Sequence, residues 1–237
     1  MDYSIQISKL FYERFINEED ISLISPHQAP GLYDAFGTKD FDKLYLKYEA
    51  DKTIPKKKVK AQEVFFDLLK ERAETGRIYI MNLDHCNSHS SFKDKVSMSN
   101  LCQEITLPTT PIQDIHDEQG EIALCILSAV NVGGLNDLSE LENICDLSVR
   151  ALEQIIDYQD YPVKAAEVST KKRRSLGVGY IGLAHYLAKN GVKYSDPKAW
   201  ELVDRLSEAF QYQLLSCLLY TSPSPRDLST SRMPSSA

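Results

Sequence analysis

The 237-residue sequence lacks any apolar run near the ~20 residues that a membrane-spanning helix requires. It also lacks a signal-peptide pattern, because its opening stretch, MDYSIQISKLFYERF, is amphipathic throughout and has no apolar core. These two absences predict a cytoplasmic protein without a membrane partner.

Paired cysteine motifs are missing as well. The cysteines are odd in number, widely spaced and without a CxxC pair: Cys86, Cys102, Cys125, Cys145 and Cys217. In a reducing compartment this excludes a disulfide framework and points to buried or reactive thiols. Of these, Cys145 is most simply a packing residue of a helix, and Cys217 adjoins a polar tail.

An excess of positive charge is also absent, since the net charge is −7 at pH 7. We therefore expect no nucleic-acid partner. Two local basic runs, KKK at 56–58 and KKRR at 171–174, are expected to be solvated faces or turns. Hydrophobic residues make up 43% of the chain, which is ordinary for a globular protein and sufficient for one large domain or two small ones.

The C-terminal stretch differs from the rest. From about Tyr220 the chain reads YTSPSPRDLSTSRMPSSA, which is rich in serine and proline and has too few apolar residues for a core. We expect residues 1–218 to be part of a globular fold and residues 219–237 to be a disordered tail of non-native sequence. Met1 falls within a helical pattern rather than before it, so the natural chain is expected to extend upstream.

Hydrophobic spacing predicts helices that alternate with short buried strands. Expected helices cover 3–16, 58–75 and 138–156, with Asn136 or Asp137 as a cap for the third. A glycine-rich turn at 177–182 should precede a fourth helix, and Asp196–Pro197 should open the last one. Strands are expected at 77–82 and within 120–134, the latter covered on both faces. This order predicts the α/β class.

The stretch SNLCQEITLP places Asn100, Cys102 and Glu104 at alternate positions. In an extended chain these three side chains would share one face. A strand cysteine is usually a small buried hydrophobe, but a buried amide and carboxylate beside it need partners and are tolerated mainly at functional sites. From the residues alone, Glu104 could act as general base, Asn100 as hydrogen-bond donor and Cys102 as the reactive atom, with the packing role left open.

Two further motifs offer alternative functions. GVGYIG, Gly177 to Gly182, matches G-x-G-x-x-G, but a dinucleotide site needs a buried strand before it, and STKKRRSL is not one. Tight turns are therefore favoured there. His85, Cys86 and His89 in HCNSH could ligate a metal, yet their spacing fits no standard zinc site, and a hydrogen-bonded loop is favoured. A metal-binding module and a nucleotide-cofactor-binding domain remain the alternatives.

Several segments, in order, closely resemble the large (alpha) subunit of aerobic class Ia ribonucleoside-diphosphate reductases. They are SPHQAPGLYDAFG, RIYIMNLDHCNSHS, SNLCQEITLPT, GEIALCILSAVN, ALEQIIDYQDYP and RRSLGVGYIGLAHYLAKNG, and the resemblance runs from about Asp2 to Leu215. It implies the central part of a ten-stranded α/β barrel with a finger loop through its centre. It also implies radical-based reduction of ribonucleoside diphosphates to 2′-deoxyribonucleoside diphosphates for DNA synthesis.

The resemblance assigns roles to the SNLCQEITLP segment. Cys102 becomes a thiyl radical that removes the 3′ hydrogen of the nucleotide, Glu104 takes the 3′-hydroxyl proton, and Asn100 holds that region by hydrogen bonds. Gln103 stands where enterobacterial members carry an apolar residue, and its side chain is expected to point away from the reactive face. The implied substrate-binding residues are Asn100, Leu101, Cys102, Gln103 and Glu104.

Cys125 resembles one of the two redox-active thiols, whose partner has no counterpart in this chain. No cofactor or metal is expected on the chain itself. The family keeps a di-iron tyrosyl radical in a separate beta subunit, and its full-length alpha subunit takes ATP and dNTP effectors with magnesium. The implied partners are a ribonucleoside diphosphate, the beta subunit, a second alpha subunit, and thioredoxin or glutaredoxin as reductant.

We expect the 237-residue chain alone to be inactive and poorly folded. The second redox thiol, the radical-relay tyrosines and part of the barrel have no counterpart here, and a partial barrel leaves strand edges unpaired. The purified chain should show no cooperative melt and no deoxynucleotide formation with the small subunit. A cooperative melting curve would contradict the first expectation, and product formation would contradict the second.

Overall fold

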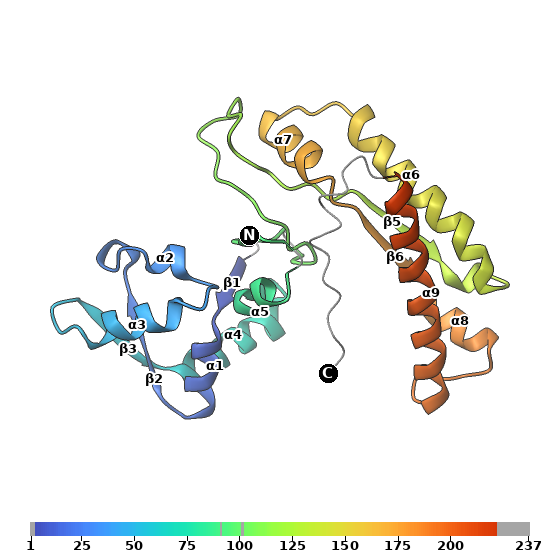
Figure 1. Cartoon of the computed structure of the whole chain (residues 1–237). Helices are drawn as coiled ribbons and strands as arrows, with labels where there is room; N and C mark the ends of the chain where they lie inside the picture. Colours follow the sequence, from blue (N-terminus) through green and yellow to red (C-terminus); the bar gives the residue numbers. More distant parts are fainter. Residues whose placement is uncertain (1–2, 91, 101, 222–237) are drawn as a thin grey trace. The chain divides into compact units, whose positions relative to one another are not determined.

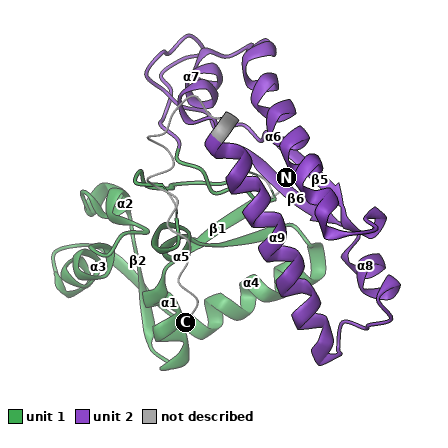
Figure 2. Ribbon diagram, turned by 45° about the vertical axis from the view of Figure 1, so that its right-hand side comes forward, with its two compact units in different colours: residues 1–108, 232–237 green, residues 109–231 purple. Residues whose placement is uncertain are grey.

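A computed structural model of the chain describes residues 3–90, 92–100 and 102–221 (Figure 1). The chain divides into two compact units, unit 1 with residues 1–108 and 232–237 and unit 2 with residues 109–231 (Figure 2). Both units mix helices and strands, so the predicted α/β class is confirmed. Within the described residues each sheet is two-stranded and no closed barrel is present.

Unit 1 begins with a strand rather than the predicted helix over 3–16. Strand β1 (Tyr3–Ile7) pairs in parallel with β4 (Ile78–Asn82), and helix α1 (Lys9–Ile16) follows it. The helix starts where Ser8 caps it, by accepting a hydrogen bond from the N–H of Phe11 at 3.3 Å. Pairing with a strand 75 residues away overrides the local helical pattern. The predicted strand over 77–82 is confirmed as β4.

A second sheet of unit 1 corrects the start of the next predicted helix. Strand β2 (Asp20–Ile24) pairs antiparallel with β3 (Lys56–Lys60), so α4 (Ala61–Thr75) begins later than residue 58. Gly76 ends α4 with φ +67°, as the glycine stop predicted. The basic run at 56–58 lies on β3, where Lys57 and Lys58 are exposed.

The rest of unit 1 packs on these sheets. Helices α2 (Leu32–Ala35), α3 (Phe41–Ala50) and α5 (Leu83–Ser88) complete it, together with a 3₁₀ turn at Pro26–Gln28. Phe65 of α4 contacts the rings of Phe11, Tyr12 and Phe15 of α1, with centroids 4.8 to 6.2 Å apart. This aromatic contact joins α1 directly to α4.

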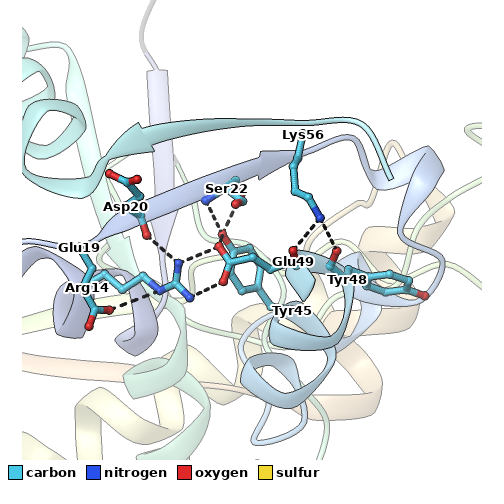
Figure 3. Close-up of polar contacts among 8 residues, drawn as sticks. All are labelled: Arg14, Glu19, Asp20, Ser22, Tyr45, Tyr48, Glu49 and Lys56. Carbon is cyan, nitrogen blue, oxygen red and sulfur yellow. Dashed lines mark hydrogen bonds and ion pairs between the residues drawn. The ribbon is translucent and has the colours of Figure 1, made fainter. Parts of the chain in front are cut away.

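A polar network ties α1, β2 and α3 together (Figure 3). Arg14 donates to both carboxylate oxygens of Glu49 and to the carbonyl of Asp20, and the Arg14 and Glu49 side chains are only 12% and 15% exposed. The hydroxyl of Tyr45 accepts from the N–H of Ser22 at 2.7 Å and donates to its carbonyl at 2.8 Å. Burial raises the pKa of Tyr45 to about 12, so the hydroxyl stays protonated.

Unit 2 is built on β5 (Leu127–Asn131) and β6 (Gly177–Ile181), which pair in parallel. Its helices are α6 (Leu141–Tyr158), α7 (Lys164–Arg173), α8 (Leu183–Lys189) and α9 (Pro197–Thr221). Helices α6 and α9 lie side by side (Figure 1), and Cys145, Leu206 and Phe210 are buried in their core. The packing role predicted for Cys145 is confirmed.

Several predicted boundaries in unit 2 are corrected. Of the strand expected within 120–134, only residues 127–131 form one, which is β5. Its Leu127 is 52% exposed, so β5 is not covered on both faces as predicted. The expected turn at 177–182 is strand β6, because Gly177–Ile181 pairs with β5. Asp137 does cap the next helical segment, in a capping box with Ser139 and Glu140. Helix α9 runs past residue 218 to Thr221, and the tail residues 222–237 lie outside the described residues.

The Tyr45 hydroxyl should contribute measurably to the stability of β2. Tyr45→Phe leaves the N–H and carbonyl of Ser22 without their partner, which should lower the local unfolding free energy by about 1–3 kcal/mol. Hydrogen exchange of residues 20–24 in the full-length protein measures this. Tyr48→Phe is the matched control on the same helix, since its hydroxyl donates only to the exposed carbonyl of Pro30. Equal exchange in the two variants would contradict the role of Tyr45.

Candidate functional site

The segment that carries Asn100, Cys102 and Glu104 is a closed loop and not a strand. We call residues 97–107 the Cys102 loop. Its backbone turns at Cys102, and Gln103 adopts φ +62°, a left-handed conformation. The N–H of Gln103 donates to the carbonyl of Asn100 at 3.1 Å. The expectation of one extended face is therefore wrong, because this turn breaks the alternation between Cys102 and Glu104.

The Cys102 loop is closed by contacts at its base. The hydroxyl of Ser99 donates to the carbonyl of Ile105 at 2.5 Å, and the N–H of Ile105 donates to Oδ1 of Asn100 at 3.1 Å. Oδ1 of Asn100 also accepts from the Ser99 hydroxyl at 3.1 Å. The acceptor oxygen of Asn100 is thus used inside the loop, which leaves its Nδ2 as the group to donate outward.

The tip of the loop presents its reactive groups to solvent. The side chains of Cys102 and Glu104 are exposed, whereas Gln103 is half-buried and donates to the hydroxyl of Ser4 on β1. An exposed thiol contradicts the packing alternative for Cys102, because that role requires burial. Leu101, the remaining residue of the predicted substrate segment, lies outside the described residues.

Two amide side chains outside the Cys102 loop bind the backbone at the point where the chain enters the loop. Asn87 of α5 donates through Nδ2 to the carbonyl of Val96 at 2.9 Å and accepts from its N–H through Oδ1 at 2.8 Å. Gln6 of β1 donates to the carbonyl of Ser97 at 2.7 Å. We call Asn87 and Gln6 the amide clamp. Sequence reasoning missed both, although the asparagine within HCNSH was the available signal.

The rest of HCNSH does not form a metal site. His85 and His89 lie one turn apart, and Nδ1 of His89 faces the carbonyl of His85 at 3.1 Å and the hydroxyl of Ser88 at 2.9 Å. Burial raises the pKa of the Cys86 thiol, which disfavours the metal-binding thiolate. In the described part of the chain, no group of three His, Cys, Asp or Glu side chains could hold a metal ion. The metal-binding alternative has no support in this geometry.

The glycine motif is likewise no dinucleotide site. That interpretation requires a buried strand to end at Gly177, but β6 begins there and continues to Ile181. Gly182, with φ +80°, then caps α8. A Cβ on Gly182 would clash with Asn131 at the end of β5, so close packing explains why this position is a glycine.

Cys125 is the exposed thiol of unit 2, just before β5. The chain around it is fixed on both sides. The N–H of Ile122 donates to the carbonyl of Ala165 at 3.1 Å, and the carbonyl of Ile126 accepts from the N–H of Gly177 at 2.9 Å. Cys125 is therefore a surface thiol on a restrained segment.

Glu121 anchors this segment to the basic run at 171–174. Its side chain is 5% exposed and bonds Lys172 and Arg173, each at 2.5 Å. Burial acts to raise the pKa of Glu121, but the hydrogen bonds from Arg173 and Lys172 outweigh it and the net shift is downward. The next residue, Arg174, pairs with Glu153 and Asp157. The run is thus ion-paired: Lys171 and Lys172 are exposed, as a solvated face predicts, whereas Arg173 and Arg174 are half-buried.

No helix within residues 3–90, 92–100 and 102–221 is both long and apolar enough to span a membrane.

Comparison with known proteins gives consistent matches. Residues 1–217 match the family model described as ribonucleotide reductase, barrel domain. The chain is 55% identical over 226 residues to the ribonucleoside-diphosphate reductase subunit alpha of Buchnera aphidicola subsp. Baizongia pistaciae, covering 92% of this chain and 30% of that protein. It is 54% identical over 220 residues to ribonucleoside-diphosphate reductase 1 subunit alpha of Escherichia coli K12, covering 91% and 29%. The chain thus spans about 30% of the length of these relatives.

Asn100 should hold the Cys102 loop closed through its oxygen. Asn100→Ala removes the acceptor for the N–H of Ile105 and the hydroxyl of Ser99, so the loop should open. Asn100→Asp keeps an acceptor at that position and is the matched variant. Hydrogen exchange over residues 97–107 of the full-length protein should be faster in Asn100→Ala than in Asn100→Asp. Identical exchange in both would show that these contacts do not close the loop.

Proposed function

The chain belongs to the ribonucleotide reductase family and matches its barrel domain over residues 1–217, and on this premise we propose that it supplies the radical-bearing part of a catalytic alpha subunit. That subunit reduces ribonucleoside diphosphates to 2′-deoxyribonucleoside diphosphates for DNA synthesis. The observation that carries the proposal is an exposed cysteine, Cys102, at the tip of a closed loop rooted on a parallel strand pair.

The proposed architecture is part of a ten-stranded α/β barrel with the Cys102 loop as its central finger loop. Strands β1 and β4 run parallel and each leads directly into a helix, α1 or α5. Strand β6, parallel to β5, leads into α8 in the same way. Repeated strand-to-helix units with parallel pairing are the units from which α/β barrels are built. In this proposal residues 1–218 belong to the barrel and residues 219–237 are non-native.

Cys102 is assigned the hydrogen-atom transfer. A thiyl radical at its sulfur takes the hydrogen atom from C3′ of the substrate, which forms the S–H bond and leaves a carbon radical on the ribose. The S–H and ribose C–H bonds have similar strengths, so the exchange is nearly balanced and can be reversed after reduction. Exposure of Cys102 supports this role, because the substrate carbon must approach the sulfur directly.

Glu104 and Asn100 are assigned to the 3′-hydroxyl group. The Glu104 carboxylate accepts the 3′-hydroxyl proton as a general base. Its side chain is exposed, as a group that reaches a substrate must be. Asn100 donates a hydrogen bond through Nδ2, while its Oδ1 stays bound to the N–H of Ile105. Leu101 and Gln103 complete the proposed substrate segment.

Cys125 is assigned to the reduction itself. The 2′-hydroxyl leaves as water, and two thiols supply the two electrons and two protons as they form a disulfide. Cys125 is one of them, and its partner thiol belongs to the part of the subunit beyond this chain. Thioredoxin or glutaredoxin restores the dithiol. An exposed thiol on a restrained segment suits repeated disulfide exchange, which requires access to the attacked sulfur.

The remaining partners follow from the family. In this proposal a di-iron tyrosyl radical held by the beta subunit would supply the radical at Cys102. Two alpha subunits associate, and ATP or dNTP effectors with magnesium bind the full-length subunit. We assign no metal and no cofactor to residues of this chain.

The radical role of Cys102 is tested by substitution in the full-length subunit. Cys102→Ala should abolish deoxynucleotide formation in the presence of the beta subunit and reductant, and it should leave substrate binding unchanged. Turnover should be lost and binding kept because the substitution removes only the sulfur that takes the hydrogen atom. Cys86→Ala, which removes the half-buried thiol of α5, should retain turnover. Turnover by Cys102→Ala would contradict the proposal.

A further inference from the structure

The entry to the Cys102 loop is held by side chains instead of by a neighbouring strand. Asn87 binds both the N–H and the carbonyl of Val96, as a paired strand would, at 2.8 and 2.9 Å. Gln6 binds the next carbonyl, that of Ser97, at 2.7 Å. A side-chain amide is suited to this because it offers a donor and an acceptor without a charge. Successive backbone groups are therefore fixed immediately before the loop begins.

The surroundings keep Asn87 in place. Its Nδ2 also donates to the carbonyl of Leu83, one turn earlier in α5, at 3.2 Å. Gly37, with φ +76°, lies against this side chain, and a Cβ there would lie 2.6 Å from Leu83 and 3.0 Å from Nδ2 of Asn87. Val96 is fully buried with Leu83 and Met81. The clamped residue thus sits in a packed core, and the loop leaves from a rigid point.

We propose that the amide clamp of Asn87 and Gln6 positions Cys102 for hydrogen-atom transfer, acting through the backbone of Val96 and Ser97. This inference rests on the proposed function of Cys102. Ser99 and Asn100 bind Ile105 across the base of the loop, so the orientation of this base depends on the point of entry as well as on the contact of Gln103 with Ser4. Cys102 lies five positions after Ser97, a distance of at most ~17 Å along an extended chain. A small rotation at Ser97 therefore becomes a larger displacement of the sulfur, and misplacement by about 1 Å can cost up to ~10²-fold in rate.

The test uses two variants that each break one part of the amide clamp in the full-length subunit. Asn87→Asp keeps the acceptor for the N–H of Val96 but puts an oxygen against its carbonyl. Gln6→Met keeps the length of the side chain and removes the donor to Ser97, so it tests the inference even if Asn87→Asp folds poorly. Each should lower kcat by about tenfold or more while KM for the nucleotide stays nearly constant.

A second readout reports on the thiol without turnover. The alkylation rate of Cys102, read peptide by peptide by mass spectrometry, should change at least about threefold in both variants, because the sulfur is displaced from its restrained position. The buried Cys145 of unit 2 serves as the internal reference and should react as in the parent protein. A loss of overall stability would alter both thiols together.

Asn190→Asp is the matched control. Its Nδ2 donates to the carbonyl of Tyr186 one helical turn earlier, at 2.8 Å, as that of Asn87 does to Leu83, but Asn190 belongs to unit 2 and is no part of the amide clamp. This control should keep the parent kcat. The inference is overturned if both clamp variants retain the parent kcat and Cys102 alkylation rate, or if Asn190→Asp loses kcat equally. Turnover by Cys102→Ala would refute the proposed function instead, and the alkylation rates would still report whether the clamp positions the thiol.

Discussion

The position of the exposed Cys102 thiol on an irregular loop depends on where the backbone of that loop finds its hydrogen bonds. A buried N–H or carbonyl without a partner costs free energy, and among the residues that the structure describes no strand pairs with Val96 to provide one. Asn87 of α5 binds both the N–H and the carbonyl of Val96, and Gln6 of β1 donates to the carbonyl of Ser97. The strand pair of β1 and β4 and the helix that follows β4 thus reach the Cys102 loop through two uncharged side chains.

Unit 2 restrains its exposed thiol by different chemistry. Cys125 lies on an irregular segment whose polar anchor is the buried carboxylate of Glu121, which is paired with two cations of α7. A buried charge is tolerated only when it is paired and hydrogen-bonded. The buried carboxylate of Glu121 therefore requires Lys172 and Arg173 as partners. Neutral amides hold one thiol segment and an ion pair holds the other.

Local pattern predicted the elements whose cause is local. The helix at Asp137 has its capping box within four residues, and Pro197 opens α9 by fixing its own φ. Local pattern failed where the cause is distant: Tyr3–Ile7 is a strand because β4 lies beside it, and the glycines of 177–182 form a strand because β5 does. The candidate site followed the same rule. Residue types made Cys102 a candidate and the family resemblance added Cys125, but the left-handed turn at Gln103 and the clamp by Asn87 depend on contacts that a linear sequence does not display.

The hydroxyl of Tyr45 has a further consequence for β2. In the described part of the chain β2 pairs only with β3, so the other side of β2 presents backbone groups that another extended chain could bind. Exposed strand edges of this kind template aggregation. Because Tyr45 occupies both the N–H and the carbonyl of Ser22, at the centre of β2, it blocks the position where such a chain would begin to pair. A single phenol thereby keeps the central N–H and carbonyl of this strand edge unavailable to a further strand.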